Sequence, residues 1–206
     1  MIRIWHIPRF RSVRVIWLME ELGEPYELEL APFPLTDSFR QRTGVVSIPT
    51  IEDGPIRLCE SIAILQYLTG RRLQRSLELG LSVGPSPDPA AYAEHLQWLH
   101  FGEASLMSHI AALALTQRRA TAGDGVGVAA QLSRRILKAR LAALERHLGD
   151  GRAHLAGEAF TIADVSVGYA VGAGASRGLD ALMGPQTLAY VQRVCARPAY
   201  AKAIAS

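Results

Sequence analysis

Cysteine is scarce in this sequence: Cys59 and Cys195 are the only two among 206 residues, and they form no C-x-x-C pair. Two cysteines so far apart argue against a dithiol oxidoreductase motif and against a cysteine-based zinc site. Free cysteines are usually buried, so we expect both to be buried structural thiols. We therefore expect no metal cofactor.

Long apolar runs are also missing, and we expect no secretory leader. The longest apolar stretch covers residues 110–115, far short of the roughly 20 residues that span a bilayer. The first residues lack the charged segment and long apolar core of a signal peptide. We expect a cytoplasmic protein that has no membrane partner.

Clustered basic charge is absent as well. The net charge is only +3, and the arginines are scattered among alanine and leucine at helical spacing. A nucleic-acid-binding protein would present a basic face, often with interleaved aromatic residues. We therefore exclude a nucleic-acid partner. The 49% of hydrophobic residues is ample for a buried core, which indicates an ordinary globular protein.

Strand and helix signals alternate over the first 78 residues. Strands are expected at residues 2–7 and 26–30 and in a hairpin of 50–51 with 56–58, and helices at 13–22, 38–42 and 61–68. Gly23 is placed to end the first helix, and Asp53-Gly54 to form the hairpin turn. This order predicts an α/β thioredoxin-like domain over residues 1–78.

Residues 79–88 have the proline, glycine and serine content of a linker, and the remainder reads as helical. A long helix is expected to open at Asp88-Pro89 and to run through Leu106. A second long helix carries one apolar stripe of Leu137, Leu141, Leu144 and Leu148, and three more helices follow. Thr161 and Asp164 form a capping box, which is a folding device and not a catalytic pair. Residues 89–206 are therefore predicted to be an all-helical domain.

The segment at residues 47–65 is the most informative in the chain. Pro49 has no N–H and holds Ile48 in an extended conformation, so the Ile48 backbone can face a ligand as one strand faces another. Ser61, at a predicted helix start, can offer its hydroxyl and free backbone N–H groups to a carboxylate, and Glu60 can accept an ammonium group. Taken singly, these residues are better explained as a strand start and a helix cap. Together they predict a site for an extended peptide with an amino-acid head.

This arrangement resembles the glutathione site of the glutathione S-transferase superfamily, in its bacterial, serine-class-like form. Residues 3–8 and 12–23 are similar to that family's first strand and first helix, and residues 160–164 to its helical-domain capping box. The resemblance implies the glutathione transferase fold, an α/β thioredoxin-like N-terminal domain followed by an all-α C-terminal domain, assembled as a homodimer. It also implies glutathione as co-substrate, bound by Ile48, Pro49, Glu60, Ser61 and Arg11.

The resemblance further implies a detoxifying transferase that conjugates the glutathione thiolate to hydrophobic electrophiles. A free thiol titrates near pH 8.5, so the protein must lower its pKa to hold the reactive thiolate at neutral pH. In relatives that use serine, the donor lies four residues before the arginine that matches Arg14. That position is Phe10 here, which cannot donate. Ser12 is the nearest hydroxyl and our candidate catalytic donor, although it is equally placed to be a simple helix cap.

Other groups remain open as partners of the bound peptide. Arg9 and Arg11 could lower the thiol pKa by charge alone, and an N–H of His6 is a further candidate donor. The lysine that relatives place near the glycyl carboxylate is missing, and Arg40 or Arg42 is a candidate replacement.

Candidates for the electrophile pocket are Phe10, Trp98, Phe101, Leu106 and Met107, although aromatic residues at helical spacing are also typical of a core. Two alternatives to the transferase remain open. One is a non-catalytic binding or regulatory protein that keeps the fold. The other is a glutathione-dependent peroxidase, dehalogenase or isomerase.

Overall fold

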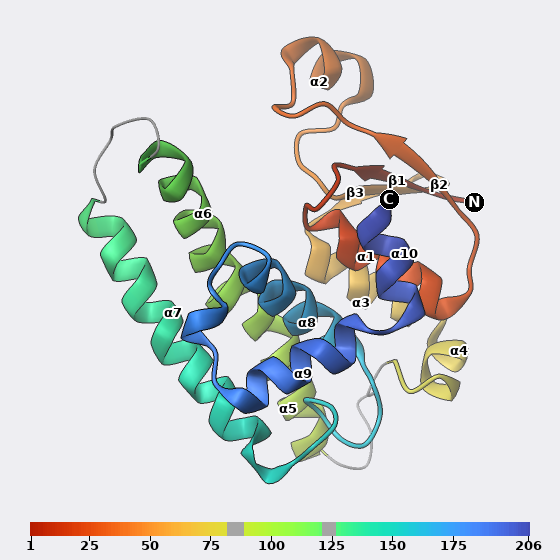
Figure 1. Cartoon of the computed structure of the whole chain (residues 1–206). Helices are drawn as coiled ribbons and strands as arrows, with labels where there is room; N and C mark the ends of the chain where they lie inside the picture. The colour runs from red at the N-terminus through yellow and green to blue at the C-terminus, as the bar shows by residue number, and fades with distance from the viewer. Residues whose placement is uncertain (82–88, 121–126) are drawn as a thin grey trace. The chain divides into compact units, whose positions relative to one another are not determined.

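The computed structural model describes residues 1–81, 89–120 and 127–206 (Figure 1). The chain divides into two compact units, Met1–Ser82 with Ala196–Ser206, and Val83–Cys195. Most of the expected linker, residues 79–88, lies outside the described residues. Residues 196–206 belong with the first unit, whereas the sequence reading placed them in a helical domain of residues 89–206.

A four-stranded sheet forms the centre of the first unit. Its strands are β1 (Ile2–His6), β2 (Tyr26–Leu30), β3 (Thr50–Asp53) and β4 (Ile56–Cys59), in the order β2-β1-β3-β4. β1 pairs with β2 in parallel, whereas β3 is antiparallel to both β1 and β4. The predicted strands and the hairpin are present, with ends that move by one or two residues.

Helices cover both faces of this sheet. They are α1 (Ser12–Leu22), α2 (Asp37–Thr43), α3 (Ser61–Arg71), α4 (Leu73–Glu78) and α10 (Pro198–Ala205). α2 lies on one face, and α1, α3 and α10 lie on the other (Figure 1). Gly23, with φ of 67°, ends α1 as predicted. α3 continues to Arg71 instead of ending at Leu68, and α4 was not predicted.

The sheet's two cores follow from alternation along β1, because successive side chains of a strand point to opposite faces. Ile4 is completely buried, and so is Val15 of α1. Trp5 belongs to a separate cluster with Phe39 of α2 and Val45, and the rings of Trp5 and Phe39 meet edge to face at 5.5 Å.

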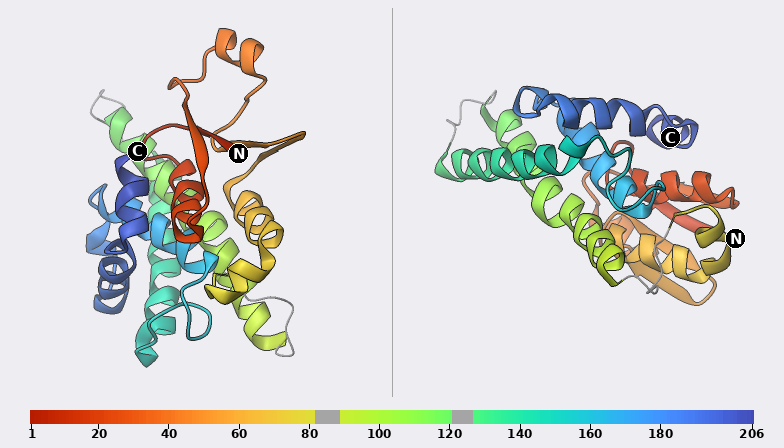
Figure 2. Two further views of the ribbon diagram at one scale, coloured as in Figure 1. Left: turned by 90° about the vertical axis from the view of Figure 1, so that its right-hand side faces the viewer. Right: turned by 90° about the horizontal axis from the view of Figure 1, so that it is seen from below.

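α10 joins the first unit because it packs along α1 (Figure 2). The Tyr200 ring lies 4.7 Å from the fully buried Trp17 ring. Next to it, the Arg197 guanidinium donates to both carboxylate oxygens of Glu21, at 2.6 and 2.8 Å. α10 therefore completes the core that α1 helps to form.

The second unit is helical throughout its described residues. Its helices are α5 (Pro89–His100), η1 (Phe101–Met107), α6 (Ser108–Ala120), α7 (Val128–His147), η2 (Leu148–Asp150), α8 (Ile162–Ala175), η3 (Asp180–Leu182) and α9 (Pro185–Cys195). α8 is buried along almost its whole length and contacts α5, η1 and α9. The predicted leucine stripe of α7 and η2 is buried.

The predicted long helix from Pro89 is interrupted by the π-helix η1. At Gly102, an added Cβ would lie 2.6 Å from the backbone carbon of Ser166 in α8. The Ser166 hydroxyl also donates to the Leu99 carbonyl at 2.7 Å. Irregular turns in a helix arise where a side chain inserts into the ladder of backbone hydrogen bonds. The close approach of α8 therefore accounts for the change in winding, which local propensity does not reveal.

The predicted capping box at the start of α8 is confirmed. The Thr161 backbone N–H donates to Asp164 at 2.9 Å, and the Thr161 hydroxyl oxygen accepts from the Ala163 N–H at 3.1 Å. The expectation for the cysteines was wrong, because Cys59 and Cys195 are both only partly buried. No helix within the described residues has the length and apolar composition required to cross a membrane.

Candidate functional site

Strand register brings three loops of the first unit to one end of the sheet. Thr50 lies opposite Trp5 of β1 and opposite Cys59 of β4, with both pairings antiparallel. The residues after Trp5, before Thr50 and after Cys59 consequently leave the sheet at the same end. These are the β1–α1 turn, the Ile48-Pro49 segment and the Glu60-Ser61 segment, so residues up to 55 positions apart in the sequence become neighbours.

Packing and a hydrogen bond hold the Ile48-Pro49 segment in place. The Ile48–Pro49 peptide bond is cis, Pro49 is buried, and Ile48 packs against the cluster that contains Trp5 and Phe39. The Thr50 hydroxyl donates to the Ser47 carbonyl at 2.7 Å and closes the turn. The backbone that is expected to face a ligand is therefore supported by apolar packing and by a local hydrogen bond.

Glu60 and Ser61 form the start of α3. Glu60 is exposed and has φ of 72°, a left-handed conformation that costs a non-glycine residue about 1–3 kcal/mol. Ser61 is only 2% exposed, and its hydroxyl oxygen accepts from Nη1 of Arg14 at 3.1 Å. No side chain caps α3, so an anion would find the positive end of its dipole here. The pair can thus offer a carboxylate and a hydroxyl side by side.

The β1–α1 turn carries the residues expected to face the thiol. Arg9 is left-handed, with φ of 66°, and the Phe10 N–H donates to the Ile7 carbonyl at 3.1 Å. The Phe10 ring packs against the Phe33 ring at 4.9 Å. α1 begins at Ser12 with Arg11 as its N-cap residue, and no side chain caps it. The start of α1 and the Arg11 side chain therefore belong to the same turn.

The Ser12 hydroxyl is directed into the protein. Ser12 is fully buried, and its Oγ lies 2.9 Å from Nδ1 of His6. The other His6 nitrogen, Nε2, lies 3.2 Å from a backbone oxygen of Ser206, which can only accept. The ring proton of a neutral imidazole is therefore on Nε2, and Nδ1 accepts the Ser12 proton. Burial lowers the pKa of His6, which favours this neutral form.

This geometry favours a structural role for Ser12 and His6, because each group already has a hydrogen-bond partner inside the first unit. The catalytic role of Ser12 stays a prediction. The sequence did not predict the contact between His6 and Ser206, because these residues are 200 positions apart. The turn also holds the start of α1, which no side chain caps, and the positively charged side chains of Arg9 and Arg11.

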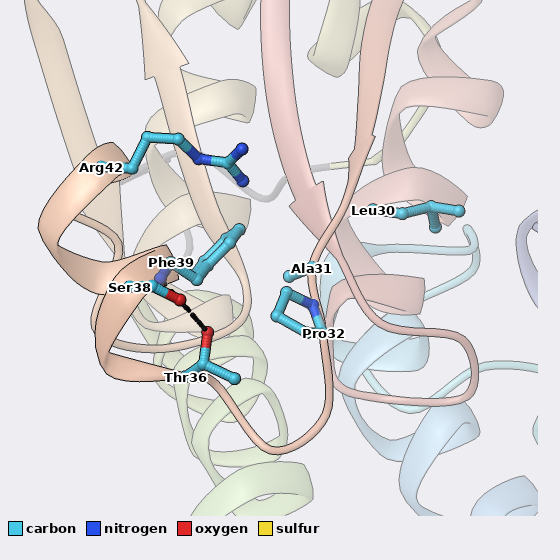
Figure 3. A pocket seen from close by; sticks show the side chains of 7 residues that line it. All are labelled: Leu30, Ala31, Pro32, Thr36, Ser38, Phe39 and Arg42. Atoms are coloured by element: carbon cyan, nitrogen blue, oxygen red, sulfur yellow. Dashed lines mark hydrogen bonds between the residues drawn. The ribbon is translucent and has the colours of Figure 1, made fainter.

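A hollow of about 580 Å³ lies between the end of β2 and α2 (Figure 3). The Arg42 guanidinium borders it and lies 5.9 Å from the centre of the Phe39 ring. The Thr36 and Ser38 hydroxyls, 3.1 Å apart, lie on the α2 side of the hollow with Phe39 and Arg42, opposite Ala31 and Pro32 (Figure 3). Arg40, the other candidate for the missing lysine, forms an ion pair with Asp37 at 3.0 Å. Of the two arginines, Arg42 alone borders this hollow.

The residues proposed for an electrophile pocket fall in different units. Phe10 is in the first unit, whereas Phe101 and Met107 are in η1 of the second. Trp98, Leu106 and Met107 are at most 4% exposed, and the Phe101 ring meets the Trp98 ring edge to face at 4.9 Å. Trp98, Leu106 and Met107 are therefore core residues of the helical unit, whereas Phe10 and Phe101 are partly exposed. Among the described residues, no cluster of histidine, cysteine and acidic side chains could hold a metal.

Comparison with known proteins decides the family. Residues 11–76 match the family model described as "Glutathione S-transferase, N-terminal domain", and residues 97–173 match "Glutathione S-transferase, C-terminal domain". The chain belongs to the glutathione S-transferase superfamily. The predicted fold class, a small mixed sheet domain with a helical domain, is therefore confirmed for this glutathione S-transferase family member.

Solved structures with this fold include glutathione complexes. A glutathione transferase family member from Pseudomonas fluorescens, with two glutathione bound, is 28% identical, with a TM-score of 0.79 over 98% of this chain and 92% of that one. A glutathione transferase from Methylococcus capsulatus has a TM-score of 0.82 over 100% of this chain and 98% of that one, and at 22% identity it supports the fold alone.

A curated relative gives a shorter match. Glutathione S-transferase 3 of Schizosaccharomyces pombe is 32% identical over 116 residues, which is 53% of this chain. The match covers 44% of that protein, so the chain spans less than half of this relative's length.

Sequence reasoning missed Arg14 as part of the site. Arg14 is fully buried in α1 and reaches Ser61 on α3. A signal was present, because Arg14 stands between Val13 and Val15 in a helix that is otherwise apolar up to Met19. A charged residue inside such a run is typical of a group with a specific buried partner.

Proposed function

We propose that this superfamily member is a glutathione transferase that conjugates the thiolate of glutathione to hydrophobic electrophiles. The observation that carries the proposal is the convergence of Ile48-Pro49 and Glu60-Ser61 at one end of the sheet. The Ile48 backbone pairs with the cysteinyl residue of the peptide, as one strand pairs with another. Ser61 and the start of α3 bind the α-carboxylate of the γ-glutamyl residue, and Glu60 binds its ammonium group.

Thiolate formation is assigned to the start of α1 and to Arg11. The free thiol has a pKa near 8.5. Each unit by which the protein lowers this pKa requires about 1.4 kcal/mol of preferential stabilisation of the thiolate. A helix N-terminus supplies about 0.3–1 kcal/mol, or up to about 2 kcal/mol when partly buried, so it accounts for roughly one unit. The nearby guanidinium adds a second stabilising charge. Together they replace the hydroxyl that Phe10 removes.

The electrophile would lie against Phe10 of the β1–α1 turn. Holding both reactants together contributes much of the rate of such a bimolecular reaction. Detoxification in the cytoplasm, as a homodimer, is the setting we propose for this activity.

A non-catalytic glutathione-binding protein is the second candidate. Phe10 and the inward hydroxyl of Ser12 favour it, because the turn has no side-chain hydroxyl for the thiolate. Isothermal titration calorimetry with reduced glutathione tests the binding site, and turnover of a chloronitroaromatic acceptor then separates the two candidates. Binding with turnover supports the transferase, and binding alone supports the second candidate.

Ser61→Ala is the variant for this test, with Ser76→Ala as its control. Both serines are buried, at 2% and 0% exposure, but Ser76 lies in α4 and outside the three converging loops. We expect Ser61→Ala to weaken glutathione binding about tenfold or more, as loss of a hydrogen bond to a charged group does. Equal affinities of the two variants would contradict the assigned site.

A further inference from the structure

Arg14 is a charged side chain that solvent does not reach. It is 0% exposed, and its Nη1 donates to the hydroxyl oxygen of Ser61 at 3.1 Å. Burying a guanidinium is costly unless hydrogen bonds compensate for the lost water. A stability role alone would be served as well by an apolar residue of similar volume, so the charge calls for a further explanation.

The direction of this hydrogen bond determines what Ser61 can do. A guanidinium N–H can only donate, so the Ser61 oxygen must be the acceptor. The Ser61 hydroxyl proton is consequently left to point at another acceptor. A donor that carries charge also polarises the hydroxyl it binds, which makes that hydroxyl a stronger donor in turn.

We propose that Arg14 is a positioning residue that makes Ser61 a selective donor for the α-carboxylate of the bound peptide. This inference rests on the proposed glutathione site and adds its basis of selectivity. Arg14 acts through Ser61: it fixes the hydroxyl oxygen as an acceptor and places a buried positive charge behind the helix start. The ligand class favoured in this way is a γ-glutamyl peptide with a free α-carboxylate, and peptides without that group are discriminated against.

A purely structural role would be to join α1 to α3. The chain provides a matched control, because Arg72, which follows α3, forms an ion pair with Glu24, which follows α1, at 3.0 Å. This pair connects the same two helices at their other ends and lies away from Ser61. Arg72→Gln therefore tests the effect of losing a contact between α1 and α3. Changes at Arg14 test the loss of carboxylate selectivity.

The experiment compares two ligands by calorimetry. The first is glutathione, and the second is γ-aminobutyryl-cysteinyl-glycine, which lacks only the α-carboxylate. The measured quantity is the ratio of the two affinities in the wild-type protein, Arg14→Gln, Arg14→Lys and Arg72→Gln. We expect the ratio to fall about tenfold in Arg14→Gln, to fall by a smaller factor in Arg14→Lys, whose shorter side chain keeps the charge, and to be unchanged in Arg72→Gln.

If Arg14 had only a structural role, its substitution would weaken the binding of both ligands equally and leave the ratio of their affinities unchanged. That result overturns the proposal. Thermal melts establish that each variant is folded, and if Arg14→Gln does not fold, the ratio in Arg14→Lys decides. Adding Ser61→Ala to Arg14→Lys supplies a second criterion: coupling requires that Arg14→Lys no longer alters the ratio once Ser61 is gone. Failure of the proposed function has a different signature, since the wild-type protein would then bind neither ligand.

Discussion

The hydroxyl of Ser12 donates to Nδ1 of His6 across 2.9 Å, inside the sheet unit. The same imidazole reaches a backbone oxygen of Ser206 beyond α10. Ser12 therefore links β1, α1 and the residue that follows α10. A serine that looks like a thiol activator in the sequence is in this fold part of the core.

Ser12→Ala is expected to destabilise the protein and to leave the bound thiol almost unaffected. The substitution leaves His6 Nδ1 buried without its donor, which costs about 1–3 kcal/mol. Urea unfolding measures the stability, and an ultraviolet titration of bound glutathione measures the thiol pKa. A rise of a full unit in that pKa, with stability unchanged, would return Ser12 to the role of thiolate donor.

Arg11→Gln is expected to give the opposite pattern. The residue is partly exposed at the start of α1, so its loss should destabilise the chain less than the loss of a fully buried hydrogen bond. The bound thiol should lose a nearby positive charge, and its pKa should rise by about one unit. The same titration checks this, with Arg40→Gln as a control, since Arg40 is paired with Asp37 on α2. Equal thiol pKa values in the two variants would remove Arg11 from the mechanism.

Stability is expected to fall as the pH drops below 6.5. Burial lowers the pKa of His95 to about 4, and burial also lowers the pKa of His6. Each imidazole binds a proton more readily in the unfolded chain than in the folded protein. The stability that the neutral imidazole contributes is therefore fully present above the unfolded-state pKa near 6.5, and it is lost as the pH falls toward the folded-state pKa. For His95 alone, the loss between pH 7 and pH 5 is about 2 kcal/mol.

His95→Leu tests this pH dependence. His95 is 2% exposed, and its Nδ1 has no hydrogen-bond partner among the described residues. An apolar replacement should therefore be tolerated, and the loss of stability from pH 7 to pH 5 should shrink by about 2 kcal/mol. Urea unfolding at the two pH values measures it. Parallel losses in the wild-type protein and the variant would exclude His95 as the cause.

Features set by nearby residues were predictable from the sequence. Alternation gave β2 at its observed bounds, Gly23 ended α1, and Thr161 with Asp164 capped α8. Each depends on residues within one turn or one strand, where propensity and spacing apply.

Features set by distant partners were not predictable. The winding of η1 depends on Gly102 meeting Ser166, and the place of residues 196–206 depends on Arg197 and Tyr200 meeting α1. For the site, the sequence indicated the residues at the ends of β1, β3 and β4. It did not indicate where their protons point, because that depends on His6 and Arg14 as buried partners.

The contact between α10 and α1 provides a comparison of two ion pairs. Arg197 makes two hydrogen bonds to Glu21, whose side chain is 11% exposed, whereas Lys202 is 70% exposed and makes one to Glu20. We expect Arg197→Ala to cost about 1–3 kcal/mol, because it leaves a nearly buried carboxylate without its charged partner, although the Trp17 Nε1–H still donates to it at 3.0 Å. Lys202→Ala should cost less than about 0.5 kcal/mol. Urea unfolding ranks the two, and equal costs would contradict a structural role for the two-bond pair.

Two helical glycines should respond to alanine in opposite directions. Gly102→Ala would place its Cβ against the backbone of Ser166, so the second unit must open between η1 and α8, and we expect a loss of about 3 kcal/mol or more. Gly70 in α3 has open space where its Cβ would be, so Gly70→Ala should stabilise the chain by about 0.5–1 kcal/mol through the lower entropy of the unfolded state. Thermal and urea unfolding measure both. If Gly102→Ala were as stable as the wild-type protein, α8 could not lie as close to η1 as the structure places it, and the reason given for the π-helix would fail with it.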